Sequence, residues 1–414
     1  MKIAIASDFH IGFGNGTLRE REAFEQAKEA FELALVEKAD LLLLAGDLFN
    51  DDVPSQEDWH QMFRLFSLLR KQKSEAKVKY SKGSEFKEFY FTHLPVIAIA
   101  GTHEFRGKDF KNALEVLQEA GCLVYLHAAK AELEIGGEKI VVQGLSGVPE
   151  KKALDALRMW NPLPEKNALN FLLLHQSIKD FLDFGDDMVA TVSLSDLPKG
   201  FDLIVNGHLH ASESKYFEER NFLMPGSTVI TQMKKLESAR PKGIFLFETG
   251  SKKIAFMPLP RQRKFFFEKI DFKGASPGQV KEAVEKKILA LLESAKEIPL
   301  IKLKLKGSLA KGVSSSSLDL KFLEGKFGEK AIVAIDADFE EESFRQKLQQ
   351  LRDSHLGKKS IAAMGFELLL KNLAETDFKD YFDAKRIFDL LAEGNVDKVV
   401  ELLSEPKEKQ PEKA

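Results

Sequence analysis

Short apolar runs alternate with amphipathic segments along the first 250 residues or so. Short apolar runs bounded by polar or turn residues predict buried strands. Such strands are expected at Lys2–Ser7, Ala39–Ala45, Val96–Ala100, Phe171–Leu174, Leu203–Val205, Leu223–Ile230 and Gly243–Phe247. Gly136-Gly137 lies between two alternating runs and predicts a hairpin.

Helices are expected between these strands, where apolar residues recur every three or four positions. The segments with this spacing are Thr17–Lys38, Glu57–Lys71 and Phe110–Ala120. Strands that alternate with helices predict an α/β fold class, in which helices cover a mixed sheet.

The pattern changes near residue 255, and the chain is expected to form a main domain over 1–255 and a small α+β domain over 258–345. In the second domain a helix and two strands are predicted at Gln279–Ala295, Ile301–Leu305 and Lys330–Ile335. Residues 360–404 are expected to be largely helical, and the charged, proline-containing tail 405–414 is expected to be disordered.

Composition narrows the class of protein. One cysteine, Cys122, excludes an internal disulfide and a multi-thiolate zinc site. The apolar N-terminus is typical of a strand rather than a signal peptide, and no apolar run reaches the roughly 18 residues of a membrane span. Because the net charge is −3, any nucleic acid must be bound through local patches and metal ions.

Five motifs rich in aspartate and histidine each follow a predicted strand. In chain order they are Asp8-Phe9-His10, Gly46-Asp47, Gly101-Thr102-His103-Glu104, His175 and Gly207-His208-Leu209-His210. Strand ends are where open α/β sheets build their sites. Carboxylates mixed with neutral imidazoles suit manganese, iron or zinc better than calcium.

Each motif alone has an ordinary structural explanation. Asp8 and His10 also fit residues that cap a turn through side-chain hydrogen bonds. A single histidine such as His175 more often has a structural role than binds a metal. Five such motifs in succession instead predict a hydrolytic centre with two cations about 3.5–4 Å apart, which clamp the attacking and leaving oxygens of a phosphoester.

The order of these motifs resembles the calcineurin-like metallophosphoesterase superfamily over about residues 1–250. Within that superfamily the chain is similar to the archaeal SbcD-type nucleases of double-strand-break repair, the family named for meiotic recombination eleven. Further segments that support this resemblance are Gly46-Asp47-Leu48-Phe49, Gln143-Gly144-Leu145-Ser146 and Pro225-Gly226-Ser227-Thr228. The resemblance implies a β-sandwich flanked by helices, followed by a small capping domain and C-terminal helices.

The resemblance also implies a role for each motif residue. One cation would be held by Asp8, His10, Asp47 and His210, and the other by Asp47, Thr102, His175 and His208. His103 would protonate the leaving 3′ oxygen or stabilise the transition state. Two residues depart from the family pattern: Thr102 stands in place of an asparagine ligand, and Asn50 in place of a phosphate-contacting histidine.

The implied protein is a manganese-dependent nuclease in the cytoplasm of a prokaryote, with two metals per chain and without a membrane segment. It would process DNA ends as a single-strand endonuclease and 3′-to-5′ exonuclease. The helices around Met62, Phe63 and Phe66 and around 110–120 would form a homodimer, or pack only against their own sheet. The helices of 360–404 would bind an SMC-like ATPase, or pack on the second domain.

Two basic segments have two interpretations each. Arg70–Lys82, with Lys73, Lys77 and Lys79, is either a solvated loop or a phosphate contact near the site. Arg261 and Arg263 have the same two explanations.

Two other functions remain open from the sequence. The motifs also fit a phosphodiesterase that acts on small nucleotides. Thr102 and Asn50 also fit a weakly active scaffold that binds DNA ends.

Overall fold

The computed structural model describes residues 1–107, 109–182, 191–340, 366, 370, 383–392 and 398–399. The chain divides into two compact units. The first comprises Met1–Glu268, Lys286–Leu303 and Lys321–Ile335, and the second comprises Lys269–Glu285, Lys304–Leu320 and Asp336–Ala414. Among the described residues no helix is long and apolar enough to cross a membrane.

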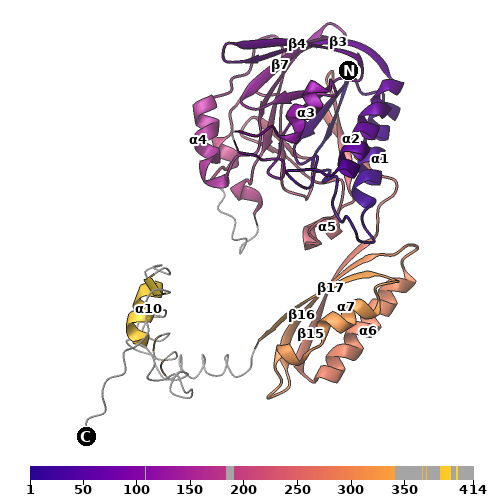
Figure 1. The fold of residues 1–414 in the computed structure, drawn as a ribbon, viewed down its shortest axis with the longest axis vertical. Coiled ribbons are helices and arrows are strands. Elements are labelled where there is room, and N and C mark those ends of the chain that lie inside the picture. Colours follow the sequence, from indigo (N-terminus) through magenta and orange to yellow (C-terminus); the bar gives the residue numbers. More distant parts are fainter. Residues whose placement is uncertain are drawn as a thin grey trace. The chain divides into compact units, whose positions relative to one another are not determined.

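Two large sheets form the centre of the first unit (Figure 1). The six-stranded sheet has the order β14-β13-β1-β2-β5-β6 and consists of β1 (Lys2–Ala6), β2 (Leu41–Ala45), β5 (Val96–Ile99), β6 (Val124–Leu126), β13 (Gly243–Glu248) and β14 (Lys253–Pro258). The eight-stranded sheet has the order β11-β12-β10-β9-β8-β7-β3-β4 and consists of β3 (Lys73–Lys82), β4 (Glu85–His93), β7 (Ala129–Ile135), β8 (Glu138–Leu145), β9 (Leu169–His175), β10 (Leu203–Gly207), β11 (Glu213–Phe217) and β12 (Arg220–Met224). The strands β1, β2, β5 and β6 are parallel, as are β8, β9, β10 and β12.

The alternation of side chains along β1 shows how the two sheets pack. Ile3 and Ile5 belong to the apolar layer between the sheets, where Phe171 of one sheet contacts Phe247 of the other at a ring-centroid distance of 5.2 Å. Ala4 and Ala6 point the other way, into a second apolar layer beneath helices. Because both faces of the strand are buried, it is a continuous apolar run in the sequence.

Helices cover the outer faces of the sandwich. The helices α1 (Glu22–Val36), α2 (Gln56–Leu68) and α3 (Ala113–Glu119) pack on the six-stranded sheet, and α4 (Glu150–Trp160) packs on the eight-stranded one. A short helix, α5 (Lys235–Ala239), precedes β13. Short 3₁₀ helices occupy η1 (Leu69–Lys71), η2 (Lys179–Phe181) and η3 (Leu194–Asp196). The predicted α/β class, a β-sandwich flanked by helices, is therefore confirmed.

Two predicted segments are wrong. The strand expected at Leu223–Ile230 ends at Met224, since Pro225 has no N–H to donate and Gly226 turns the backbone at φ +74°. The loop expected at Arg70–Lys82 is largely the strand β3.

A three-stranded sheet follows in the chain, with the order β15-β16-β17. Its strands are β15 (Phe265–Ala275), β16 (Leu300–Leu309) and β17 (Ile332–Glu340), and the helices in this part of the chain are α6 (Pro277–Glu293), η4 (Ser315–Ser317) and α7 (Leu320–Lys326). Val280, Val284 and Ile288 of α6 are buried, which explains its apolar periodicity. The domain boundaries at 255–258 and 345 stay predictions.

One C-terminal helix, α10 (Ala384–Ala392), lies within the helical segment expected at 360–404. The expected tail 405–414 and most of 360–404 lie outside the described residues.

Candidate metal centre

The five motifs meet because parallel strands of both sheets end at one edge of the sandwich. Asp8 and His10 follow β1, and Asp47 follows β2, its neighbour in the sheet. In the other sheet β9 ends at His175, which pairs in register with Gly207 at the end of β10. The loop after β5 contributes Gly101 to Glu104 from a third parallel strand.

Four of these residues have backbones in the left-handed region. The φ angle is 55° at Asp8, 50° at His10, 51° at Asp47 and 83° at His208. Such a conformation costs roughly 1–3 kcal/mol per non-glycine residue, and it concentrates at functional sites. Hydrogen bonds between the loops stabilise it: Asp8 N donates to Gly46 O at 2.9 Å, and His10 N donates to Asp47 O at 3.0 Å.

The glycines of the motifs are required by close approach. A Cβ at Gly46 would lie 2.4 Å from His175 Nδ1, and one at Gly101 would lie 2.1 Å from Asp47 Oδ1. A Cβ at Gly207 would lie 2.1 Å from Ala45 O. Each glycine therefore leaves room for a polar group contributed by another segment of the chain.

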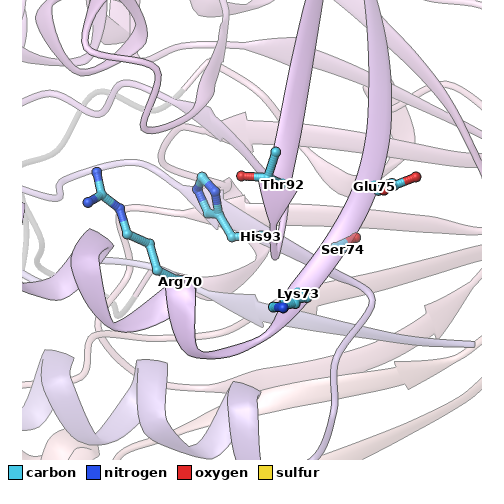
Figure 2. A pocket seen from close by; sticks show the side chains of 6 residues that line it. All are labelled: Arg70, Lys73, Ser74, Glu75, Thr92 and His93. Atoms are coloured by element: carbon cyan, nitrogen blue, oxygen red, sulfur yellow. The ribbon is translucent and has the colours of Figure 1, made fainter.

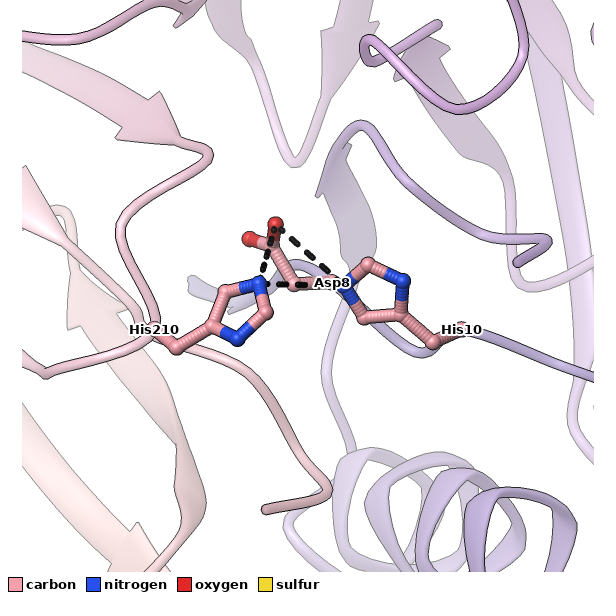
Figure 3. Close-up of side chains that lie close together, drawn as sticks. All are labelled: Asp8, His10 and His210. Carbon is pink, nitrogen blue, oxygen red and sulfur yellow. Dashed lines mark hydrogen bonds and ion pairs between the residues drawn. The ribbon is translucent and has the colours of Figure 1, made fainter. Parts of the chain in front are cut away.

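Asp8, His10 and His210 form one group whose ligand atoms all lie within 4.8 Å of one another. Their side chains converge on one point, Asp8 and His10 from the loop after β1 and His210 from the loop after β10 (Figure 3). His10 Nε2 lies 3.1 Å from His210 Nε2, while Asp8 Oδ1 lies 3.9 Å and 3.8 Å from those two nitrogens. His10 Nδ1 is buried without a hydrogen-bond partner among the described residues.

Asp47, His175 and His208 form a second group whose ligand atoms also lie within 4.8 Å of one another. Asp47 belongs to a third such group with His10 and His103. His175 Nε2 is 3.1 Å from Asp47 Oδ2, and its Nδ1 donates to Ala45 O at 2.7 Å. That second bond fixes the ring, so Nε2 faces Asp47. Asp47 is thus shared between a group that contains His10 and a group that contains His175 and His208.

Burial keeps three imidazoles neutral at physiological pH. Removal from water lowers the pKa of His10 to about 3 and that of His208 to about 4. The pKa of His210 is also lowered well below its ordinary value, again by burial. A neutral imidazole is the form that binds a metal, so these rings need not release a proton first.

Asp47 and His175 behave as an ion pair. Burial acts to raise the pKa of Asp47, but the charge and hydrogen bond of His175 outweigh it and lower that pKa. Burial acts to lower the pKa of His175, and Asp47 raises it to about 10. A cation that binds this pair must displace the proton from His175, so binding here releases a proton.

Glu104, the last residue of the third motif, is a site residue for which the sequence predicted no role. Its side chain is fully buried and accepts hydrogen bonds from Gly101 N at 2.6 Å, Phe49 N at 2.9 Å and Asp47 N at 3.1 Å. Burial raises the pKa of this carboxyl to about 8. Glu104 therefore ties the loop after β5 to the loop after β2, and its place directly after His103 was the available signal.

The exposed side chain of His103 is positioned by a backbone group. Its Nδ1 donates to Asn50 O at 2.6 Å, and its N donates to Asp47 Oδ1 at 2.9 Å. The carbonyl of Asn50 orients His103, and its side-chain amide lies 3.4 Å from Asp51 Oδ2. A contact of Asn50 with DNA stays a prediction. Thr102 is half-buried between two anchored residues, and its role as a ligand stays a prediction.

A buried polar network lies behind His210. Thr231 Oγ1 is 2.6 Å from His210 Nδ1. Lys242 Nζ donates to His210 O, Ser227 Oγ and Glu237 Oε1, each at 2.9 Å. The buried pair of Lys242 and Glu237 thus joins β13 to α5 and to the loop that carries His210.

Of the four lysines of β3, Lys73, Lys77 and Lys79 lie on its exposed face. Lys77 Nζ pairs with Glu88 at 2.8 Å, and Lys73 lines a hollow with Arg70, Ser74, Glu75, Thr92 and His93 (Figure 2). Lys73 pairs in register with His93, which precedes β5, whereas the Gly101 loop follows β5. This end of β3 is therefore at the opposite edge of the sandwich from the five motifs, which favours the solvated interpretation for Lys73. Lys79 lies further along the strand, opposite Glu132 of β7.

The two arginines beyond β14 differ in their surroundings. Arg263 is held by Glu22 at 3.4 Å and by Ile298 O. The Arg261 side chain is 86% exposed, with Glu29 3.6 Å away. A DNA contact by either stays a prediction.

Comparison with known proteins agrees with this geometry. The family profile for calcineurin-like phosphoesterase matches residues 1–212. Among curated proteins the chain is similar to the double-strand break repair protein mre-11 of Caenorhabditis elegans (24% identical, over 63% of this chain and 41% of that protein) and to MRE11 of Mus musculus (26%, 65% and 42%). It is also similar to the DNA double-strand break repair protein Mre11 of Archaeoglobus fulgidus (22%, 95% and 84%).

The chain spans about two fifths of the length of the animal relatives. The family profile covers half of the chain and includes all five motifs. Proteins of this family bind divalent metals, and the carboxylate and imidazole groups described above are ligands of that kind. The chain therefore belongs to the calcineurin-like phosphoesterase family.

Proposed function

We propose that this protein is a metal-dependent nuclease that processes DNA ends in double-strand-break repair, with single-strand endonuclease and 3′-to-5′ exonuclease activity. The observation that carries the proposal is Asp47, which belongs to two adjacent groups of ligand side chains. A shared carboxylate between two sets of imidazoles is the arrangement of a two-metal phosphodiesterase. The repair proteins to which the chain is similar supply the substrate class.

Two divalent cations, manganese in our proposal, would neutralise phosphate charge and lower the pKa of water at this site. Asp8, His10 and His210 would hold one of them, and His175 and His208 the other, with Thr102 as a further oxygen donor. Asp47 would reach both. The left-handed loops and the three glycines hold these side chains close together before any substrate arrives.

His103 is proposed as the general acid. Its Nδ1 proton is engaged by Asn50 O, which leaves Nε2 as the nitrogen that turns toward a substrate. The side chain is exposed, yet its ring lies 4.8 Å from that of His10, edge to face. From this position it would donate a proton to the leaving 3′ oxygen.

We propose two partners, a second copy of this chain and an SMC-like ATPase. In α2, Met62 and Phe66 are buried against the sheet, while Phe63 is 41% exposed. Phe63 is thus the side chain of this helix that remains available to a second copy in a homodimer. An SMC-like ATPase would bind the C-terminal segment 360–404, of which α10 is the described helix.

Thr102 favours one alternative, a weakly active scaffold that binds DNA ends. A hydroxyl is a shorter donor than a carboxamide, so the second cation would bind less tightly. The other alternative, hydrolysis of small nucleotides, uses the same groups and differs only in the substrate.

The test is degradation of labelled single- and double-stranded DNA with manganese by wild type, His103→Ala and Thr102→Asn. We expect degradation by wild type, a loss of about 100-fold or more in His103→Ala with metal binding retained, and a gain in Thr102→Asn. Activity that appears only in Thr102→Asn would support the scaffold. Turnover of cyclic or small phosphodiesters without cleavage of DNA would support the small-nucleotide enzyme.

A further inference from the structure

Most rings at the centre have a partner for the nitrogen that faces away from the cation positions. His175 uses Ala45 O, His210 uses Thr231 Oγ1 and His103 uses Asn50 O, at 2.6–2.7 Å. Such partners fix the tautomer of a ligating histidine and raise its basicity. His208 stands out, because the group that faces its ring is a carboxylate.

That carboxylate belongs to Glu150, the first residue of α4. Its Oε1 lies 3.7 Å from His208 Nε2 and accepts a hydrogen bond from Ser177 N at 3.1 Å. Its Oε2 is buried and has no hydrogen-bond partner among the described residues, as is true of Ser177 Oγ. A buried carboxylate oxygen retains strong acceptor capacity, and the nearby His208 ring is a group that can satisfy it.

The backbone holds Glu150 in this position. Glu150 O accepts a hydrogen bond from Thr191 Oγ1 at 2.7 Å. Three residues earlier, Gly147 N donates to Ala100 O at 2.8 Å, and a Cβ at Gly147 would lie 2.8 Å from Gly101 C. The start of α4 is therefore fastened to the same loop that carries Thr102 and His103.

We propose that Glu150 is a positioning residue for His208, which rests on the proposed function of the centre. Its carboxylate accepts a hydrogen bond from the Nε2–H of His208, either directly after a small ring movement or through a water. This bond leaves Nδ1 of the ring facing Asp47 and His175. The 3.7 Å separation is longer than a direct hydrogen bond, which is why one of these two adjustments is required. A carboxylate acceptor also makes Nδ1 of His208 a stronger metal ligand. This matters at the cation position where Thr102 offers only a hydroxyl.

The test is calorimetric titration of manganese into the chelator-treated full chain. We expect two sites in wild type. In Glu150→Ala the weaker site loses about 10–100-fold in affinity and the other is unchanged, as for other residues that orient a ligating histidine. Glu150→Gln, which keeps an acceptor oxygen, loses less. Asp155→Ala removes an exposed carboxylate from the same helix and leaves both affinities unchanged.

Thermal unfolding without metal separates this effect from loss of the fold, since Glu150→Gln is expected to melt within a few degrees of wild type. Wild-type affinity at both sites in Glu150→Ala would overturn the assignment, and so would equal weakening of both sites. If wild type itself takes up no cation, the proposed function fails, which is a different result from a two-site wild type that is indifferent to Glu150.

Discussion

At the scale of single residues, the centre depends on groups whose protonation is set by burial and by close neighbours. His10 is held neutral because burial lowers its pKa to about 3, whereas His175 is held charged by Asp47. The sequence identified both histidines as candidate ligands from their positions after strands. Their opposite protonation depends on the distance between atoms on different strands, which no pattern along the chain reveals.

The neutral His10 predicts a dependence of stability on pH. Its folded pKa of about 3 lies below the ordinary value of 6.5. Above pH 6.5 the ring is neutral in both the folded and the unfolded protein. As the pH falls from 6.5 toward 3, the ring binds a proton in the unfolded chain but not in the folded one. The free energy of unfolding of wild type, relative to His10→Gln, should therefore fall by about 1.4 kcal/mol per pH unit.

Urea unfolding of the chelator-treated proteins at pH 7, 6, 5 and roughly 4.5 measures this difference. His60→Gln is the control, because this exposed ring lies outside the groups of candidate ligands and its replacement should leave the pH profile of wild type unchanged. If the free energy of unfolding changes with pH in the same way for wild type and His10→Gln, His10 is not held neutral.

At the scale of elements, strands that are buried on both faces were predicted well, and several strands with a polar face, such as β3 and β4, were missed. β2 is Leu-Leu-Leu-Leu-Ala and is recognisable as a run, and the glycines and aspartates that follow such runs located the centre. In β3 the buried Ala76, Val78 and Tyr80 alternate with exposed lysines. That alternation has the period of a strand, but the density of charge suggested a loop. Glu104 and Glu150 could not be assigned because their partners are backbone groups or rings on distant elements.

The packing of strand ends predicts that Gly207 tolerates no side chain. An added Cβ would lie 2.1 Å from Ala45 O, 2.4 Å from Ser7 Oγ and 2.6 Å from His175 Nδ1. We expect Gly207→Ala to lower the free energy of unfolding by about 1–3 kcal/mol, as overpacking does. We also expect weaker manganese binding, because β9 and β10 must separate at His175.

Gly250→Ala is the matched control, since a Cβ there meets nothing within 4 Å and the change should stay within about 0.5 kcal/mol. Urea unfolding and manganese titration measure both effects. Equal stability and equal metal affinity in the two variants would contradict the close approach of the strands.

At the scale of the whole molecule, charge limits how the protein can bind DNA. The net charge is −3, Lys77 is paired with Glu88, and Lys73 lies at the edge of the sandwich opposite the five motifs. Bulk attraction, Lys73 and Lys77 therefore contribute little to affinity at the proposed catalytic centre. Binding of single-stranded DNA should depend instead on the cations of that centre and on a few local contacts, of which the exposed Arg261 is one candidate.

Fluorescence anisotropy with labelled single-stranded DNA and the His103→Gln variant, which should bind without cutting, measures this dependence. About three phosphate contacts would reduce affinity roughly 10–20-fold between about 50 and 200 mM salt, and chelation of manganese should weaken binding further. A Lys73→Ala, Lys77→Ala double variant should bind as the parent does. If it loses most of the affinity, DNA is bound by the exposed face of β3, which carries both lysines. If chelation has no effect, DNA is not bound through the cations of the metal centre.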